Sequence, residues 1–307
     1  MTITRAPGRG FRSLRRYWPF YTMIAVPLVY FLIFKYGPMV GNIIAFRKYL
    51  PGGPWEGTSF VGFKYFGMFI ADPNFWQIFT NTLQLSVASL IFGFPFPIIF
   101  ALLLNEVRQR TFKGAVQTIS YLPHFLSIVV VAALVKDMLT PTGGLVNIAL
   151  SWVGLAPVAF MQDSNAFVWV YVISGIWQEM GWGAILYLAA LTGINSELYE
   201  AAAMDGAGRW NQTLHVTLPG ILPTVVVLLV LNIGNVLNVG FEKVLLLYNP
   251  TIYDKADVLS TYLYRMAMDM NSFSYATAIG LFESVLGVIL VLTANWAAKR
   301  FANSGLW

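Results

Sequence analysis

Six stretches of about 20 or more mostly apolar residues divide this chain of 307 residues. They lie at residues 18–36 (extending toward 46), 75–104, 115–135, 166–191, 218–239 and 275–298. A helix of about 20 apolar residues is long enough to cross the hydrocarbon core of a bilayer. Only 11% of the residues are charged, whereas soluble domains have about 25%. The sequence therefore predicts an all-α integral membrane bundle of six transmembrane helices.

Lysine and arginine are unevenly distributed around these stretches, and their distribution predicts the orientation. Residues 1–17 carry five arginines and no acidic residue. With this end inside, the inner segments hold eleven basic residues and the outer segments seven. Because basic residues concentrate on the cytoplasmic side, we expect both termini in the cytoplasm. We interpret residues 1–17 as a basic cytoplasmic segment and residues 18–307 as one transmembrane domain.

Several kinds of chemistry have no support in the sequence. The chain has no cysteine, which excludes disulfides, cysteine-ligated zinc, iron–sulfur clusters and thiol nucleophiles. His124 and His215 lie too far apart in sequence to indicate a metal site. Five arginines so close to a membrane span do not favour nucleic-acid binding. We expect no catalytic residue, no metal, no resident cofactor and no nucleic-acid partner.

A polar segment, INSELYEAAAMDGAGRWNQTLHVT at residues 194–217, separates the fourth and fifth stretches and faces the cytoplasm in this orientation. Asn195 or Ser196 can cap a helix whose first turn carries Glu197. Gly206 breaks that helix, and a second short helix follows before the fifth stretch. A hairpin lying on lipid headgroups would usually be basic, whereas this segment has three acidic residues to one arginine. Protein docking is the better interpretation.

This segment resembles the EAA loop of binding-protein-dependent ABC importer permeases. Glu200-Ala201-Ala202 and Asp205-Gly206-Ala207, followed by Leu218-Pro219 and Pro223, carry the resemblance. In that family the loop forms coupling helices that sit in a cleft on cytosolic ATPase subunits. The resemblance implies an ATPase-coupling role for Glu200, Ala201, Ala202, Asp205, Gly206, Ala207 and Arg209.

Further motifs are similar to the carbohydrate branch of these permeases, related to the maltose transporter. The motifs are Phe60-Val61-Gly62-Phe63, Asp72-Pro73-Asn74-Phe75-Trp76, Asn105-Glu106, Tyr121-Leu122-Pro123, Gly143-Gly144-Leu145-Val146-Asn147, Tyr248-Asn249-Pro250 and residues 257–265. Several of them resemble a narrower group, the LplB-like oligosaccharide permeases. The resemblance covers nearly the whole chain after about residue 17, but the extra outer domain of the larger maltose permease has no counterpart here.

The resemblance implies the partners and the location of the chain. No G-x-x-x-x-G-K-[ST] sequence occurs, so ATP and Mg would bind on another polypeptide. A homologous second permease, two ATPase subunits and an extracytoplasmic solute-binding protein would complete an importer in a bacterial or archaeal cytoplasmic membrane. A secondary transporter would show inverted repeats, and an intramembrane enzyme would need a histidine or a metal beside its carboxylates. These two alternatives have neither feature in the sequence.

Polar residues inside the fourth stretch are candidates for the substrate path, because such residues are costly in a membrane and tend to be functional. Trp177, Gln178, Glu179 and Trp182 lie close together there. A carboxylate, an amide and indole rings suit a sugar, whose hydroxyl groups need hydrogen bonds and whose C–H face stacks on aromatic rings. The alternative is that Glu179 pairs with a neighbouring helix.

Amides recur every three residues in the fifth stretch, at Asn232, Asn235 and Asn238, which predicts that they share one side of a helix. They suit a neutral hydroxylated solute, or they bond two helices together. In the sixth stretch, Glu283 lies beside a stripe of small residues that is typical of a packing face. We expect a structural hydrogen bond for Glu283 rather than contact with substrate.

Overall fold

The computed structural model describes residues 9–237 and 240–302 and confirms the all-α class. The helices are α1 (Arg9–Phe31), α2 (Gly37–Val40), α3 (Lys64–Ile70), α4 (Phe75–Ala88), α5 (Pro95–Glu106), α6 (Arg110–Tyr121), α7 (Ile128–Met138), α8 (Leu145–Trp152), α9 (Ser164–Thr192), α10 (Ser196–Met204), α11 (Arg209–Gln212), α12 (Leu218–Gly234), α13 (Phe241–Leu247), α14 (Tyr253–Ala256), α15 (Leu259–Met268) and α16 (Phe273–Ala302). In the described ranges, β-structure is limited to an isolated bridge between Arg47 and Phe60.

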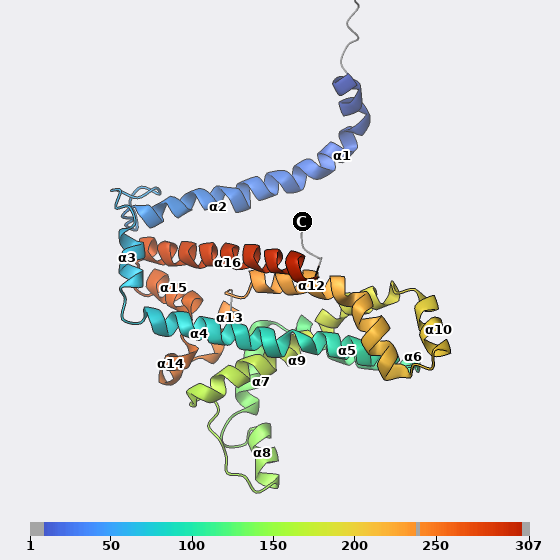
Figure 1. Ribbon diagram of the computed structural model, residues 1–307. Helices are drawn as coiled ribbons and strands as arrows, with labels where there is room; N and C mark the ends of the chain where they lie inside the picture. Colours follow the sequence, from blue (N-terminus) through green and yellow to red (C-terminus); the bar gives the residue numbers. More distant parts are fainter. Residues whose placement is uncertain (1–8, 238–239, 303–307) are drawn as a thin grey trace, which may run out of the picture.

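The first predicted span is a long helical rod that continues past Gly37-Pro38. A π-helical turn at Leu32–Tyr36 joins α1 to α2, and a 3₁₀ turn at Gly41–Phe46 ends the rod, as the extension toward residue 46 predicted. Figure 1 shows the rod diverging from the rest of the bundle toward its N-terminal end. In the most apolar stretch of the rod no side chain is buried against this chain, so the apolar surface of that stretch is left to lipid or to another subunit. Ala45, near the end of the rod, is buried.

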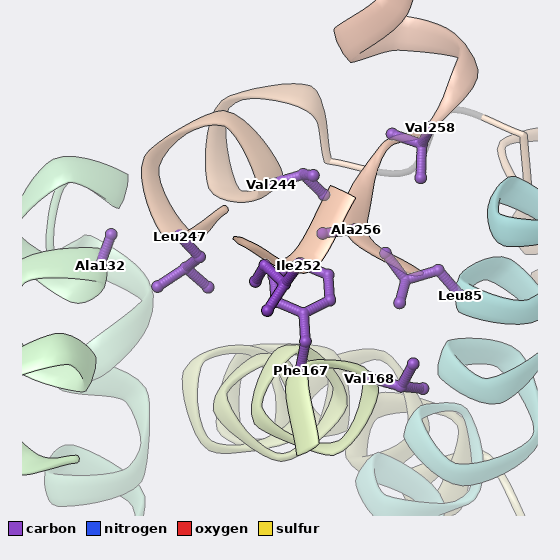
Figure 2. Close-up of a cluster of buried hydrophobic side chains, with 9 residues drawn as sticks. All are labelled: Leu85, Ala132, Phe167, Val168, Val244, Leu247, Ile252, Ala256 and Val258. Atoms are coloured by element: carbon purple, nitrogen blue, oxygen red, sulfur yellow. The ribbon is translucent and has the colours of Figure 1, made fainter. Parts of the chain in front are cut away.

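The central helix of the bundle is α9, which packs against α5, α6 and α12. Figure 2 shows one core cluster in which Phe167 and Val168 of α9 lie beside Leu85 of α4, with Val244 and Leu247 of α13 on the other side. All five side chains are buried. Burial of an aliphatic side chain stabilises a fold by about 1.5–3 kcal/mol, so this cluster holds α13 firmly against α9.

The third predicted span, residues 115–135, is not one continuous helix. A 3₁₀ turn at Leu122–Phe125 ends the helix that starts at Arg110, and the chain bends by 102° before α7 begins at Ile128. Leu122 keeps helical angles, and the chain turns where Leu126 and Ser127 become extended. Pro123 contributes to the end of the helix because it cannot donate a backbone hydrogen bond to the preceding turn. Ser127 then caps α7 by accepting from the backbone N–H of Val130.

The fifth span differs from its prediction at both ends. A π-helical turn at Thr213–Thr217 joins α11 to α12, so one continuous helix runs from Arg209 to Gly234. The helix ends at Gly234, five residues before the predicted end at 239. Asn235 therefore follows the helix rather than continuing a stripe along it, and Asn238 lies outside the described residues.

The count of six spans stays a prediction. Four described helices are long and apolar enough to cross a membrane, at Tyr17–Phe46, Phe75–Glu106, Arg209–Gly234 and Phe273–Arg300, and the bent pair of α6 and α7 makes up to five. Helix α9 has 29 residues, a length of about 43 Å, but it is not among these helices. Gln178 and Glu179 in its middle reduce its mean hydropathy.

Candidate functional site

A cavity of about 840 Å³ lies between α9, the residues from Ser86 to Pro97, α12 and α13. Its volume is within the range of about 300–1,000 Å³ that is usual for small-molecule sites. Four of the predicted path residues line it: Gln178, Glu179, Asn232 and Asn235. The fold therefore brings together polar side chains from two predicted spans that are separated by more than fifty residues in sequence.

Glu179 has a partner as well as a place in the cavity. The Nδ1 atom of His124 lies 2.9 Å from Glu179 Oε2, and the ring of His124 stacks on Trp182 with centroids 4.4 Å apart. His124 stands in the 3₁₀ turn where the third span bends, so the bend carries this histidine to α9. Glu179 thus pairs with a neighbouring element and also lies on the cavity wall, so both alternatives from the sequence stay open.

The two amides are anchored by their own helix. Asn232 Nδ2 donates to Leu228 O at 2.8 Å, and Asn235 Nδ2 donates to Leu231 O at 3.4 Å. These bonds fix the direction of each amide while both residues line the cavity. The third predicted amide, Asn238, lies outside the described residues.

Trp177, Trp182 and Glu283 do not line this cavity. Trp177 and Trp182 are each nearly half-exposed, and Trp182 serves as the stacking surface for His124. Glu283 lies in α16, and its Oε1 atom is buried with no hydrogen-bond partner among the described residues. Oε1 therefore does not form the hydrogen bond that we expected for Glu283.

Lys243 is a cavity residue that the sequence interpretation missed. It belongs to α13, in the connection between the fifth and sixth predicted spans, where a lysine is unremarkable. Its side chain is nevertheless buried, and its Nζ donates to Tyr171 O at 3.1 Å. The sequence Phe241-Glu242-Lys243-Val244-Leu245-Leu246-Leu247 contained a weak indication, because a lysine amid so many apolar residues suits a helix folded back on the bundle.

The polar segment between α9 and α12 forms a hairpin whose first arm is the short helix α10, as the sequence predicted. Its second arm is not a separate short helix, because α11 is the start of the continuous helix Arg209–Gly234. Asn195 caps α10 by accepting from the backbone N–H of Glu197 at 3.0 Å. At the other end, Gly206 N donates to Ala203 O at 3.0 Å and Ala207 N donates to Ala202 O at 2.9 Å. This pair of bonds is the Schellman motif, which requires a left-handed residue, and Gly206 has φ +75°.

Two contacts hold the hairpin to the bundle. Arg209 Nη1 lies 3.3 Å from Glu106 Oε2 at the end of α5. Tyr199 Oη and Thr217 Oγ1 are 3.0 Å apart and link α10 to the start of the α12 helix. Glu106 is a second functional candidate that the sequence interpretation did not select. Both groups of its ion pair with Arg209 are about half-exposed, so the pair orients the hairpin more than it stabilises the fold.

The outer surface of the hairpin is suited to protein docking. Of the predicted coupling residues, Glu200, Ala201, Asp205 and Gly206 are exposed, and Ala202 and Ala207 are half-buried. Three large apolar side chains stand among them: Leu198, Met204 and Trp210 are 54%, 90% and 73% exposed. Figure 1 shows α10 at one end of the bundle, and its contacts are with α11 and the π-helical turn Thr213–Thr217. Exposed apolar residues gathered at one place are typical of interaction sites.

No group of three or more histidine, aspartate or glutamate side chains that could hold a metal ion occurs in the described part of the chain. The cavity and the hairpin are the two places where predicted site residues gather. One continuous helix connects the hairpin to the cavity: it starts at Arg209 in the hairpin and reaches Asn232 on the cavity wall.

Comparison with known proteins gives consistent matches. The family described as "Binding-protein-dependent transport system inner membrane component" matches residues 93–303. Protein LplB of Bacillus subtilis (strain 168) is 44% identical over 296 residues, which cover 96% of this chain and 93% of that protein. The polygalacturonan/rhamnogalacturonan transport system permease protein YteP of the same organism is 45% identical over 287 residues, with coverages of 94% and 89%.

A solved structure matches as well. One chain in the crystal structure of a bacterial alginate ABC transporter, in complex with an alginate pentasaccharide-bound periplasmic protein, superposes with a TM-score of 0.89. That chain is 44% identical, and the match covers 97% of this chain and all of that one.

Proposed function

This chain belongs to the family of binding-protein-dependent transport system inner membrane components, and from that membership we propose that it is one permease subunit of an ATP-driven importer that carries an oligosaccharide into the cytoplasm. The observation that carries the proposal is the polar cavity. Amides and a carboxylate from α9 and α12 face one space of about 840 Å³ inside an otherwise apolar bundle. Sugar hydroxyl groups can donate to and accept from such side chains.

The names of the similar proteins favour a carbohydrate as the solute. One is a permease for polygalacturonan and rhamnogalacturonan, and another belongs to an alginate transporter. The two alternatives considered from the sequence were a secondary transporter and an intramembrane enzyme. The fold does bring His124 beside Glu179, which the sequence did not show, but the matched family and the named relatives are transport components. The chain itself would catalyse no reaction, and ATP hydrolysis would take place on partner subunits.

The partners follow from the two exposed surfaces. The hairpin with Leu198, Met204 and Trp210 would dock on one of two ATPase subunits, and the unburied first rod and the open side of the cavity would face a homologous second permease. An extracytoplasmic binding protein would deliver the oligosaccharide. ATP-driven closure of the ATPase pair would then push the hairpin and change the side of the membrane to which the cavity opens.

Transport by the reconstituted importer tests this function. We expect uptake of an oligosaccharide into proteoliposomes only when the chain is combined with the second permease, the ATPase and the binding protein, and only with ATP inside. The purified chain alone should hydrolyse no ATP, because it has no phosphate-binding loop. Uptake driven by an ion gradient without ATP would contradict the proposal.

The proposal includes an orientation with both termini in the cytoplasm. This orientation is based on the distribution of lysine and arginine, with eleven on the predicted inner side and seven on the outer side. A reporter fused after residue 307 should therefore be active only in the cytoplasm. Activity on the outer side would mean an odd number of spans.

Substitutions at Asn235 and Trp177 test whether the path candidates that line the cavity differ in function from those that do not. Asn235 lines the cavity, whereas Trp177 does not. We expect Asn235→Ala to raise the KM for uptake severalfold, because one hydrogen bond contributes about 0.5–1.5 kcal/mol. Trp177→Ala should change KM less than twofold. Equal effects of the two substitutions on KM, measured with the assembled importer, would place both residues in helix packing.

A further inference from the structure

The ammonium group of Lys243 is held inside the cavity wall with few partners. The residue is 6% exposed and lines the cavity. Its Nζ donates to Tyr171 O at 3.1 Å and lies 4.9 Å from the centre of the Tyr171 ring. An ammonium has three N–H groups, and a single carbonyl satisfies one of them.

No carboxylate of the described residues neutralises Lys243. The ion pairs in this part of the chain join Arg47 to Glu56, His124 to Glu179, Arg209 to Glu106 and Arg265 to Asp257. Glu179 attracts Lys243 from a distance, but its Oε2 is paired with His124 at 2.9 Å. Glu242 also lines the cavity, yet its side chain is exposed. Within residues 9–237 and 240–302, Lys243 thus has no close counter-ion.

Lys243 remains a cation at neutral pH. Its helix α13 lies outside the predicted spans, and burial lowers the pKa of Lys243 from its ordinary value to about 8, against the opposing attraction of Glu179. A group with this pKa is mostly protonated at pH 7. Burial of a charge without a counter-ion costs free energy of folding, whereas an apolar side chain at position 243 would have no such cost.

The surroundings fix the position of this charge. Val244 and Leu247, the buried residues of α13 in Figure 2, pack into the core against Phe167. Gly240, just before α13, donates its backbone N–H to Tyr171 Oη at 3.0 Å. Across from the ammonium stands Gly175, where an added Cβ would lie 3.4 Å from Nζ. The absence of a side chain at Gly175 leaves room beside the charge on the cavity side.

From this arrangement we propose that Lys243 binds a carboxylate of an acidic oligosaccharide during its passage through the cavity. The inference rests on the proposed function and adds the charge of the solute to it. A uronic acid unit fits the chemistry on the wall: its carboxylate accepts from Lys243, and its hydroxyl groups donate to Glu179 and to the oxygens of the cavity amides. Lys243 is then a specificity-determining residue rather than a structural one.

The test uses the complete reconstituted importer with a panel of uronic acid oligosaccharides and their carboxyl-reduced, neutral counterparts. Lys243→Met and Lys243→Gln remove the charge, Lys243→Arg keeps it, and Lys64→Met is a matched control at an exposed lysine. Uptake is measured with saturating binding protein, so that the same loaded binding protein serves every variant. Co-purification of the partners and basal ATP hydrolysis report assembly.

We expect Lys243→Met and Lys243→Gln to lower uptake of the acidic oligosaccharide about tenfold to a hundredfold, the range for loss of a hydrogen bond to a charged group. Lys243→Arg and Lys64→Met should stay within about threefold of the wild type, and basal ATP hydrolysis should not change.

Three results would overturn the assignment of Lys243: wild-type uptake by an assembled neutral variant, an equally large loss in Lys243→Arg, or a wild-type importer that takes up only the neutral sugars. None of these three results contradicts the proposed function. Absence of ATP-driven uptake of any sugar in the panel would overturn the proposed function itself, and the assignment with it.

Discussion

Gly206→Val is expected to abolish transport and to release the ATPase subunits while the spans still insert. Gly206 has φ +75° at the Schellman turn that ends α10, and a β-branched residue is strained there by about 1–3 kcal/mol. Relief of that strain breaks the two hydrogen bonds of the turn and changes the angle between α10 and α11. The exposed side chains of Met204 and Trp210, which stand on either side of the turn, would no longer present one surface.

Gly208→Val is the matched control for this experiment. Gly208 lies two residues further along, with φ −68° and ψ 168°, where any residue is allowed, and an added Cβ would meet nothing within 4 Å. Co-purification of the ATPase and uptake are measured for both variants. Retained ATPase and full uptake in Gly206→Val, or an equal loss in Gly208→Val, would show that the backbone of the hairpin does not determine docking.

Gly181→Ala is expected to destabilise the whole bundle. Helices α6 and α9 cross so closely at this point that an added Cβ would lie 2.1 Å from Ser120 O and 2.5 Å from Ser120 C. Both atoms belong to the backbone, so no side chain can move aside and the helices must separate. Overpacking of this kind costs typically 1–3 kcal/mol and occasionally more, and we expect the upper end. The melting temperature of the purified importer should fall by several degrees.

The crossing of α6 and α9 also positions the wall of the cavity, so uptake serves as a second measurement. Ser120 stands at the end of α6, just before the turn that carries His124 to Glu179. Separation of the helices should therefore lower uptake as well as stability. Gly114→Ala is the control: Gly114 lies in the same helix α6, an added Cβ there meets nothing within 4 Å, and alanine is the better helix former. A Gly181→Ala protein as stable as Gly114→Ala would contradict the close crossing.

The parts of the molecule that the sequence predicted well are those with local causes. The break at Gly206 and the cap at Asn195 depend on residues within a few positions, and both are present. The fifth and sixth apolar stretches became α12 and α16 for the same reason. The bend at Pro123 was also local, but the apolar residues on both sides concealed it, since hydropathy does not register a single proline.

The parts that could not be predicted depend on contacts between distant residues. Nothing in the sequence near Lys243 places it in a cavity, because its burial requires α13 to fold back against α9, more than sixty residues earlier in the chain. The pair of His124 and Glu179 likewise arises only from the 102° bend. Gln178, Glu179 and Asn232 line the cavity, and the sequence drew attention to them because a polar residue in an apolar helix is conspicuous by itself. Their contact with substrate stays a prediction.

The uninterrupted helix from Arg209 to Gly234 has a mechanical consequence. Its 26 residues make a rod of about 39 Å, and the hydrogen bonds along such a rod resist stretching and compression. An axial thrust on Trp210, at one end, would therefore displace Asn232 at the other, and the π-helical turn at Thr213–Thr217 and Pro223 are the two places between them where the helix can bend. Under the proposed docking, this helix would transmit movement of the hairpin to the wall of the cavity.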